Sequence, residues 1–252
     1  MRASHRRSSN VELLTRIKSK LEQTQAANLL SLISHQPDVH EQDKSLKHHL
    51  LIVLATADLA HFEKLADALQ DDSGQIDVMV LSQDELNAST DVFPVTFLEM
   101  RRRYEVLAGQ DVLANLRIDR DHLRLRCEQE LRNMLLRMQR QFILHRHHNR
   151  DLLESLRRSN LVFRRCLRAA VYLSEGEQRD YGDCSPEETS QILNIDLAIL
   201  DRTSEVLHSS GSPAPAVVAD VYGQFIVHVH QVTEHVDRME HETIVDVELF
   251  GE

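Results

Sequence analysis

The chain has 252 residues, a formal net charge of −11 and only 7 glycines, 5 prolines and 3 cysteines. Its length allows a core that needs no disulfide bond or structural metal, and its acidity argues against a general nucleic-acid coat protein. No apolar run approaches the roughly 20 residues that cross a bilayer, and the basic segment 1–10 is unlike a signal peptide. We expect a mostly helical, cytoplasmic protein with neither a membrane nor a nucleic-acid partner.

The first forty-odd residues predict a helix and then a loop. Apolar residues recur at helical spacing after Asn10, so a first helix is expected to run from a cap at that residue to about Ile33. Segment 34–47 is polar, contains Pro37 and has no period. It therefore predicts a loop.

Strand signals follow the loop. Residues 48–56 (HHLLIVLAT) and 76–81 (IDVMVL) are unbroken apolar runs of strand length, and residues 59–69 between them have a helical pattern. A strand, helix, strand order implies a right-handed crossover and a parallel pair of strands. Residues 92–97 (VFPVTF) predict a short third strand that Pro94 interrupts.

The second half has the spacing of long bundle helices. A cap at Ser185 predicts a further helix to Leu200, and residues 209–215 (SSGSPAP) predict a connector. We expect an α+β, mostly helical fold, with an α/β domain over 1–115 and an antiparallel helical bundle over 116–252. Three apolar stripes predict the bundle core: Cys127, Leu131, Met134, Leu135, Met138 and Phe142; Leu152, Leu156, Phe163, Leu167, Ala170 and Val171; and Val218, Val221, Phe225, Val229, Val232, Val236 and Met239.

An extended pattern in residues 92–143 carries a family resemblance. It comprises a Phe-Pro element at 93–94, a Phe-Leu-acid-aliphatic step at 97–100, a Leu-x-Gly-x-Asp turn at 107–111, and a Leu- and Arg-rich helix from Leu123. This pattern resembles the segment that follows the catalytic sheet in bacterial nucleotidyltransferase-domain proteins. The resemblance implies that the α/β domain is a reduced nucleotidyltransferase-like domain.

In active members of that family, a Gly-Ser pair cradles the triphosphate and an Asp-x-Asp-type pair on the next strand holds a divalent metal. Magnesium neutralises the phosphoryl charge, and glycine lets the backbone approach the phosphates. Aligned with this chain, the Gly-Ser position falls near Ser34 and His35, and the acid positions become Lys47 and His49. Thr96 stands where relatives often carry an acid. The resemblance thus implies a degenerate transfer site with no catalytic residue, metal or cofactor.

The chain is therefore expected to be a nucleotidyltransferase-like protein that has lost magnesium-dependent transfer and acts as a binding or regulatory protein. We expect it to bind a nucleotide, a protein or another copy of itself. The alternative is an active nucleotidyltransferase that uses magnesium, a nucleoside triphosphate and a rearranged set of acids. Asp38, Glu41, Asp43 and Asp77 are the acids that could form such a set.

The middle of the chain is basic, since residues 101–168 hold 17 arginines and no lysine. Arg102, Arg103 and Arg124 are candidates to bind a phosphate group, and pairing with the chain's own acids is the alternative. Arg140 and His145 have the spacing of the helix-borne pair in HEPN-type ribonucleases. Because arginines and histidines are frequent in this segment, the same spacing also arises by chance.

Overall fold

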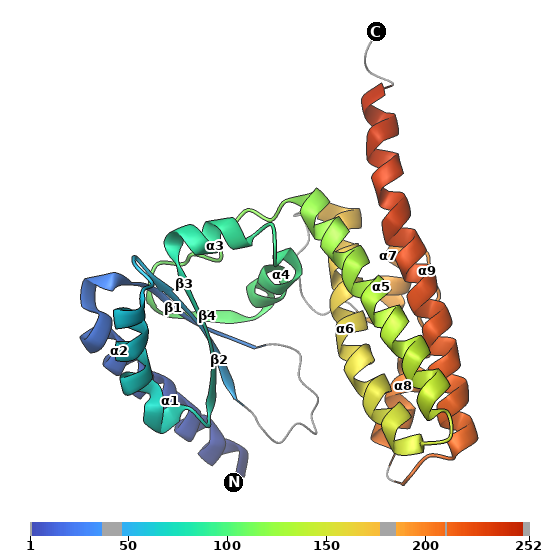
Figure 1. The fold of residues 1–252 in the computed structure, drawn as a ribbon, viewed down its shortest axis with the longest axis horizontal. Coiled ribbons are helices and arrows are strands. Elements are labelled where there is room, and N and C mark those ends of the chain that lie inside the picture. Colours follow the sequence, from blue (N-terminus) through green and yellow to red (C-terminus); the bar gives the residue numbers. More distant parts are fainter. Residues whose placement is uncertain (1, 37–46, 177–184, 210, 249–252) are drawn as a thin grey trace. The chain divides into compact units, whose positions relative to one another are not determined.

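The computed structural model describes four stretches of the chain, residues 2–36, 47–176, 185–209 and 211–248. The protein is mostly helical and has a four-stranded mixed sheet within these stretches, which confirms the α+β class (Figure 1). In the same stretches, no helix has both the length and the apolar composition needed to span a membrane.

The chain divides into two compact units. Unit 1 comprises Met1–Val92 and Thr96–Arg117, and unit 2 comprises Phe93–Val95 and Ile118–Glu252. The expected division into two domains after residue 115 stays a prediction.

Unit 1 is built on the sheet, whose strand order is β3-β2-β1-β4. Strands β2 and β3 are parallel, whereas β1 is antiparallel to both of its neighbours, β2 and β4. The elements in chain order are α1 (Arg2–Gln25), a 3-10 turn (Ala26–Asn28), β1 (Leu29–His35), β2 (His48–Leu54), α2 (Leu59–Leu69), a second 3-10 turn (Gln70–Asp72), β3 (Ile76–Ser82), α3 (Gln83–Ser89), α4 (Pro94–Arg102) and β4 (Tyr104–Gly109).

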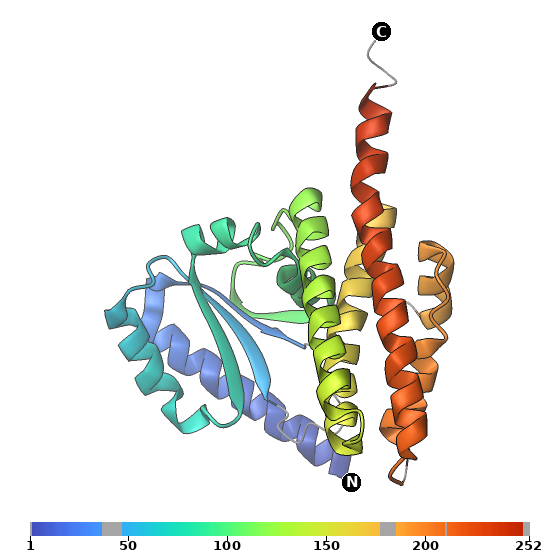
Figure 2. The same cartoon turned by 45° about the vertical axis from the view of Figure 1, so that its right-hand side comes forward.

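Helices α1 and α2 lie side by side over one face of the sheet (Figure 2). Their apolar stripes and the alternate residues of the strands beneath them form one buried cluster. The helices are amphipathic, and this burial is what selects their orientation. The cluster includes Leu13, Ile17, Leu21, Leu32, Leu50, Ile52, Leu54, Leu65, Ala68, Leu69 and Ile76.

A buried carboxylate ties the turn after α2 to α1. The Asp72 side chain is only 1% exposed and forms ion pairs with Arg16 and, at 3.2 Å, with Lys20. The hydrogen bond from Arg16, and then that from Lys20, holds the pKa of Asp72 below its usual value. Because a buried charge needs such partners, these contacts set where α1 lies along the sheet.

The predicted first helix is wrong at its C-terminal end. Helix α1 ends at Gln25, and Ala26 has a positive φ of 45° that breaks the helical path. The segment predicted as the last helical turns and the first loop residues is β1, which hydrogen-bonds to neighbours on both sides. Leu32 and Ile33 are both fully buried although they point to opposite faces. Only the neighbouring strands can satisfy the backbone of such a segment.

The predicted third strand is also wrong. Pro94 begins helix α4, where a proline costs no hydrogen bond because the first-turn N–H groups have no helical partner. The edge strand next to β1 is instead β4, which was not predicted. By contrast, β2, α2 and β3 lie close to their predicted bounds, and the parallel pairing of the two strands is confirmed.

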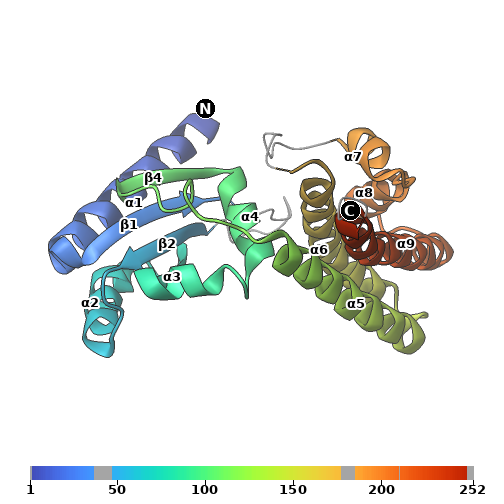
Figure 3. The same ribbon diagram turned by 90° about the horizontal axis from the view of Figure 1, so that it is seen from above.

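Unit 2 consists of α5 (Arg120–His145), α6 (Asn149–Glu175), α7 (Pro186–Leu193), α8 (Ile199–His208) and α9 (Pro215–Glu248). Helices α5 and α6 form an antiparallel hairpin, and α9 packs against both (Figure 3). Most residues of the three predicted stripes are buried at this packing, including Cys127 of α5 and Leu156 of α6. The prediction that apolar residues form the bundle core is confirmed for them.

The predicted helix from Ser185 to Leu200 is two helices. The cap at Ser185 is present, with a reciprocal hydrogen-bond pair to Glu188. Helix α7 then ends at Leu193, because Asn194 adopts the left-handed conformation that terminates helices. Helix α8 starts a new axis at Ile199.

Candidate functional site

Four residues form one row across the whole sheet of unit 1. Tyr104 of β4 pairs with His35 of β1, His35 pairs with His49 of β2, and His49 pairs with Asp77 of β3. Directly paired residues share a face of the sheet, so the four side chains lie on one face. The ring centres of the two histidines are 5.6 Å apart, and His49 Nδ1 is 3.2 Å from Asp77 Oδ2. We call these four residues the polar row.

Burial shifts the pKa of two residues of the polar row, His35 and Tyr104. The pKa of His35 is lowered to about 4, mainly because the ring is withdrawn from water and secondarily because of the nearby His49. His35 is therefore a neutral imidazole near pH 7. The pKa of Tyr104 is raised by burial and by the hydrogen bond that its hydroxyl donates to Asp111.

Two of the five predicted transfer-site residues come together. His35 and His49 are direct cross-strand neighbours. Ser34 is next to His35 in β1 and so points to the opposite face, since side chains alternate along a strand. Lys47 is exposed immediately before β2, and Thr96 is half-buried in α4.

The donor atoms of this site do not fit magnesium. Magnesium takes oxygen ligands in octahedral geometry, whereas imidazole nitrogen suits softer metals. The polar row offers two imidazoles and a single carboxylate, Asp77, and the cationic Lys47 is near in sequence. In the described stretches, no three His, Cys, Asp or Glu side chains are grouped to hold a metal ion.

Three of the acids required by the alternative lie outside the described residues: Asp38, Glu41 and Asp43. Asp77 is described, and its carboxylate contacts His49. A rearranged acid set thus stays a prediction.

The three predicted phosphate-binding arginines belong to different environments. Arg102 is half-buried at the end of α4, and the exposed Arg103 follows it. The backbone oxygen of Arg103 accepts a hydrogen bond from Gln36 at 3.0 Å, which places this residue at the same end of the sheet as His35. Arg124 lies in α5 of unit 2, where it forms a 3.1 Å ion pair with Glu128. Arg124 therefore pairs with an acid of the chain itself, which was the alternative to phosphate binding.

The residues of the predicted nuclease pair both lie on α5. A separation of five residues turns their side chains about 140° apart around a helix. His145 Nδ1 lies 3.3 Å from Asp151 Oδ2, and Arg140 is exposed. The nuclease function stays a prediction to which this geometry adds no support.

A polar cavity of about 720 Å³ lies at the other end of the unit 1 sheet, where β3 and β4 finish. No sequence pattern indicated this cavity, because α3 and the segment after β4 are about 25 residues apart in the chain. Its buried apolar lining is Leu86, Val112 and Leu116. Its polar lining consists of Gln83, Asn87, Thr90, Gln110, Asp111, Asn115 and Arg117. Such a combination of apolar and polar walls suits a small polar ligand.

The lowered pKa of His35 predicts a stability that depends on pH. The unfolded chain takes up this proton near pH 6.5 and the folded chain only near pH 4, so the stability that His35 contributes is complete above about 6.5 and lost as the pH falls towards 4. We expect the wild type to lose on the order of 1 kcal/mol of unfolding free energy from this group between pH 7 and pH 5, because the half-buried ring is partly screened.

Urea unfolding of the wild type and of His35→Gln at both pH values measures this loss. The glutamine variant should lose correspondingly less stability. His230→Gln, which removes an exposed histidine of α9, is the control and should behave as the wild type does. Equal losses in the wild type and in His35→Gln would contradict the lowered pKa.

The polar row also contains a residue, Tyr104, that was not predicted from the sequence. Tyr104 joins the row through β4, and only the short aromatic and β-branched run before Gly109 indicated a strand there. The histidines were predicted from the family resemblance, but their contact depends on β1, which was predicted as the end of a helix and the start of a loop. No protein-family model, curated protein or solved structure that was compared with this chain matches it.

Proposed function

We propose that the chain is a nucleotidyltransferase-like protein that has lost magnesium-dependent transfer and acts by binding a nucleotide or a protein. The observation that carries this proposal is the contact between His35 and His49. These are positions that the resemblance assigns to phosphate binding and to a metal-binding acid. His35 ends β1 and His49 lies on the next strand, which is the order that the resemblance implies.

The chemistry of the polar row supports the loss of transfer. Phosphoryl transfer requires that carboxylate-held magnesium neutralise the charge on the phosphates. Here a neutral His35 and a His49 already in contact with Asp77 occupy that end of the sheet. The positive charge of Lys47 would further disfavour a divalent cation.

The polar cavity supports a binding function. It has the volume of a small-molecule site, and its amide side chains can both donate and accept hydrogen bonds. Arg117 and Asp111 add one positive and one negative charge to this wall. A polar ligand with both hydrogen-bond donors and acceptors would therefore find complementary groups there.

The test restores the missing carboxylates. The double variant Lys47→Asp with His49→Asp should bind Mn²⁺, measured by electron paramagnetic resonance as a stand-in for Mg²⁺, at least about tenfold more tightly than the wild type. The control is Lys64→Asp, which makes the same lysine-to-aspartate change on the exposed surface of α2. It should bind Mn²⁺ as weakly as the wild type does. Tight Mn²⁺ binding by the wild type would overturn the proposal.

Titration calorimetry with each nucleoside triphosphate, with and without magnesium, separates the two candidate functions. Binding that does not depend on magnesium supports a nucleotide-binding protein. Tight magnesium-dependent binding, together with transfer of the nucleotide, would establish the active transferase instead. Absence of binding would leave a protein as the expected partner.

A further inference from the structure

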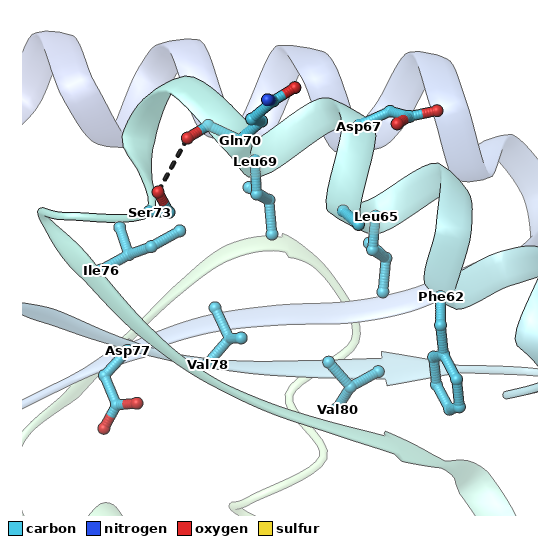
Figure 4. Close-up of a pocket in the computed structure, with 11 residues that line it drawn as sticks. Phe62, Leu65, Asp67, Leu69, Gln70, Ser73, Ile76, Asp77, Val78 and Val80 are labelled. Carbon is cyan, nitrogen blue, oxygen red and sulfur yellow. Dashed lines mark hydrogen bonds between the residues drawn. The ribbon is translucent and has the colours of Figure 1, made fainter.

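An apolar groove runs between α2 and the edge strand β3 (Figure 4). It has a volume of about 720 Å³, and Leu65 and Leu69 of α2 face Val78 and Val80 of β3 across it. Phe62 lines one end and is 42% exposed, and Val78 is 41% exposed. Apolar surface of this kind is costly to leave in water.

The backbone beside this groove is also open. Among the described strands, β3 has a single neighbour, β2, with which all of its residues Ile76–Ser82 pair without a bulge. Alternate N–H and C=O groups of its outer side therefore point away from the sheet. The strand contains no proline and no lysine, the residues that usually protect such an edge. The opposite edge strand, β4, pairs with β1 through a register shift.

We propose that β3 pairs antiparallel with β3 of a second copy of this chain, around a twofold axis at Met79. This inference goes beyond the proposed function and does not depend on it. The pairing places Val78 opposite Val80 of the second copy, twice per dimer, and joins the two sheets into one. The N–H and C=O groups of both edges are then satisfied.

The sequence of β3 fits a twofold axis. The central Val-Met-Val is the same in both directions, so each β-branched Val78 meets another valine, a favourable cross-strand pair. The axis falls near the middle of the groove, because Phe62 lies near Val80 at one end and Leu69 lies near Ile76 at the other (Figure 4).

The charges of the edge also fit this register. Asp77 stands opposite Leu81 of the second copy, and the two Asp77 carboxylates are about 13 Å apart along the strands. At physiological ionic strength this separation exceeds the screening length of about 8 Å. Asp77 points away from α2 and towards the face where it contacts His49, so it does not close the groove (Figure 4).

A second copy explains these features better than a small apolar molecule does. A small molecule could fill the groove, but it would leave the row of outer N–H and C=O groups of β3 without partners. A strand satisfies both, and the Val-Met-Val centre of β3 places valine opposite valine when β3 pairs with its own reversed copy.

The first test measures mass by sedimentation equilibrium over a range of concentrations. The wild type should reach twice the 29.0 kDa of one chain. Val78→Lys, which places a charge at the proposed interface, should raise the dimer dissociation constant about tenfold or more. Val92→Lys makes the same change at a similarly exposed valine of unit 1 and should have no effect. Circular dichroism checks that both variants are folded.

The second test determines the register. Cysteine variants Val78→Cys and Val80→Cys, mixed in equal amounts, should be joined by a short thiol cross-linker more efficiently than either variant alone. Wild-type protein measures the background from the native cysteines. A wild type that stays monomeric, a dimer that Val78→Lys does not weaken, or equal cross-linking in the mixed and separate samples would each overturn the proposal.

Discussion

Gly109→Ala is expected to lower the free energy of unfolding by about 3 kcal/mol or more. Gly109 ends β4 with a φ of +77°, a conformation that costs an L-amino acid about 1–2 kcal/mol. An added Cβ would also lie 2.0 Å from the backbone oxygen of Leu30. That oxygen accepts the hydrogen bond of Gln110, so it cannot move without loss of the pairing between β1 and β4.

Gly74→Ala is the matched control for this substitution. Nothing lies within 4 Å of the Cβ that it would add. Its unfolding free energy in urea should stay within about 0.5 kcal/mol of the wild type. If the two alanine variants were equally stable, the close approach of β4 to β1 would be wrong, and with it the position of Tyr104 in the polar row.

Phe225→Ala is expected to destabilise unit 2 by about 3–5 kcal/mol. Phe225 is fully buried in α9 and meets Phe163 of α6 edge-on, with ring centres 5.1 Å apart. Truncation removes this aromatic contact and leaves a cavity between the two helices, where the neighbours can relax only in part.

Val227→Ala on the same helix is the control for the bundle. Val227 is 54% exposed, so its truncation should change the unfolding free energy by no more than about 0.5 kcal/mol. Thermal unfolding followed by circular dichroism at 222 nm compares the variants. A small effect of Phe225→Ala would contradict the packing of α9 against α6.

The candidate site could be predicted from the sequence only in part. The family resemblance selected His35 and His49, which lie in contact. Asp77 was selected only as an acid of a rearranged set, and Tyr104 was not selected at all, because both reach the polar row through strand pairing. The polar cavity was missed for the same reason, since Asn87 and Arg117 meet only through the fold.

Local patterns by themselves determined the helical bundle and the parallel strands. The apolar residues of α9 recur at helical spacing, and those of β2 form one continuous run, so each segment shows within its own sequence which side chains must be buried. The cap at Ser185 likewise acts within one helical turn.

Only the tertiary structure decided that Leu29–His35 is a strand. Its apolar residues also suit the helical spacing that precedes them, and nothing local separates the two conformations. The segment becomes a strand because β2 and β4, which lie about 20 and 75 residues further along the chain, supply hydrogen-bond partners on both of its sides. The polar row is a consequence of that pairing, since backbone hydrogen bonds between distant segments bring its side chains together.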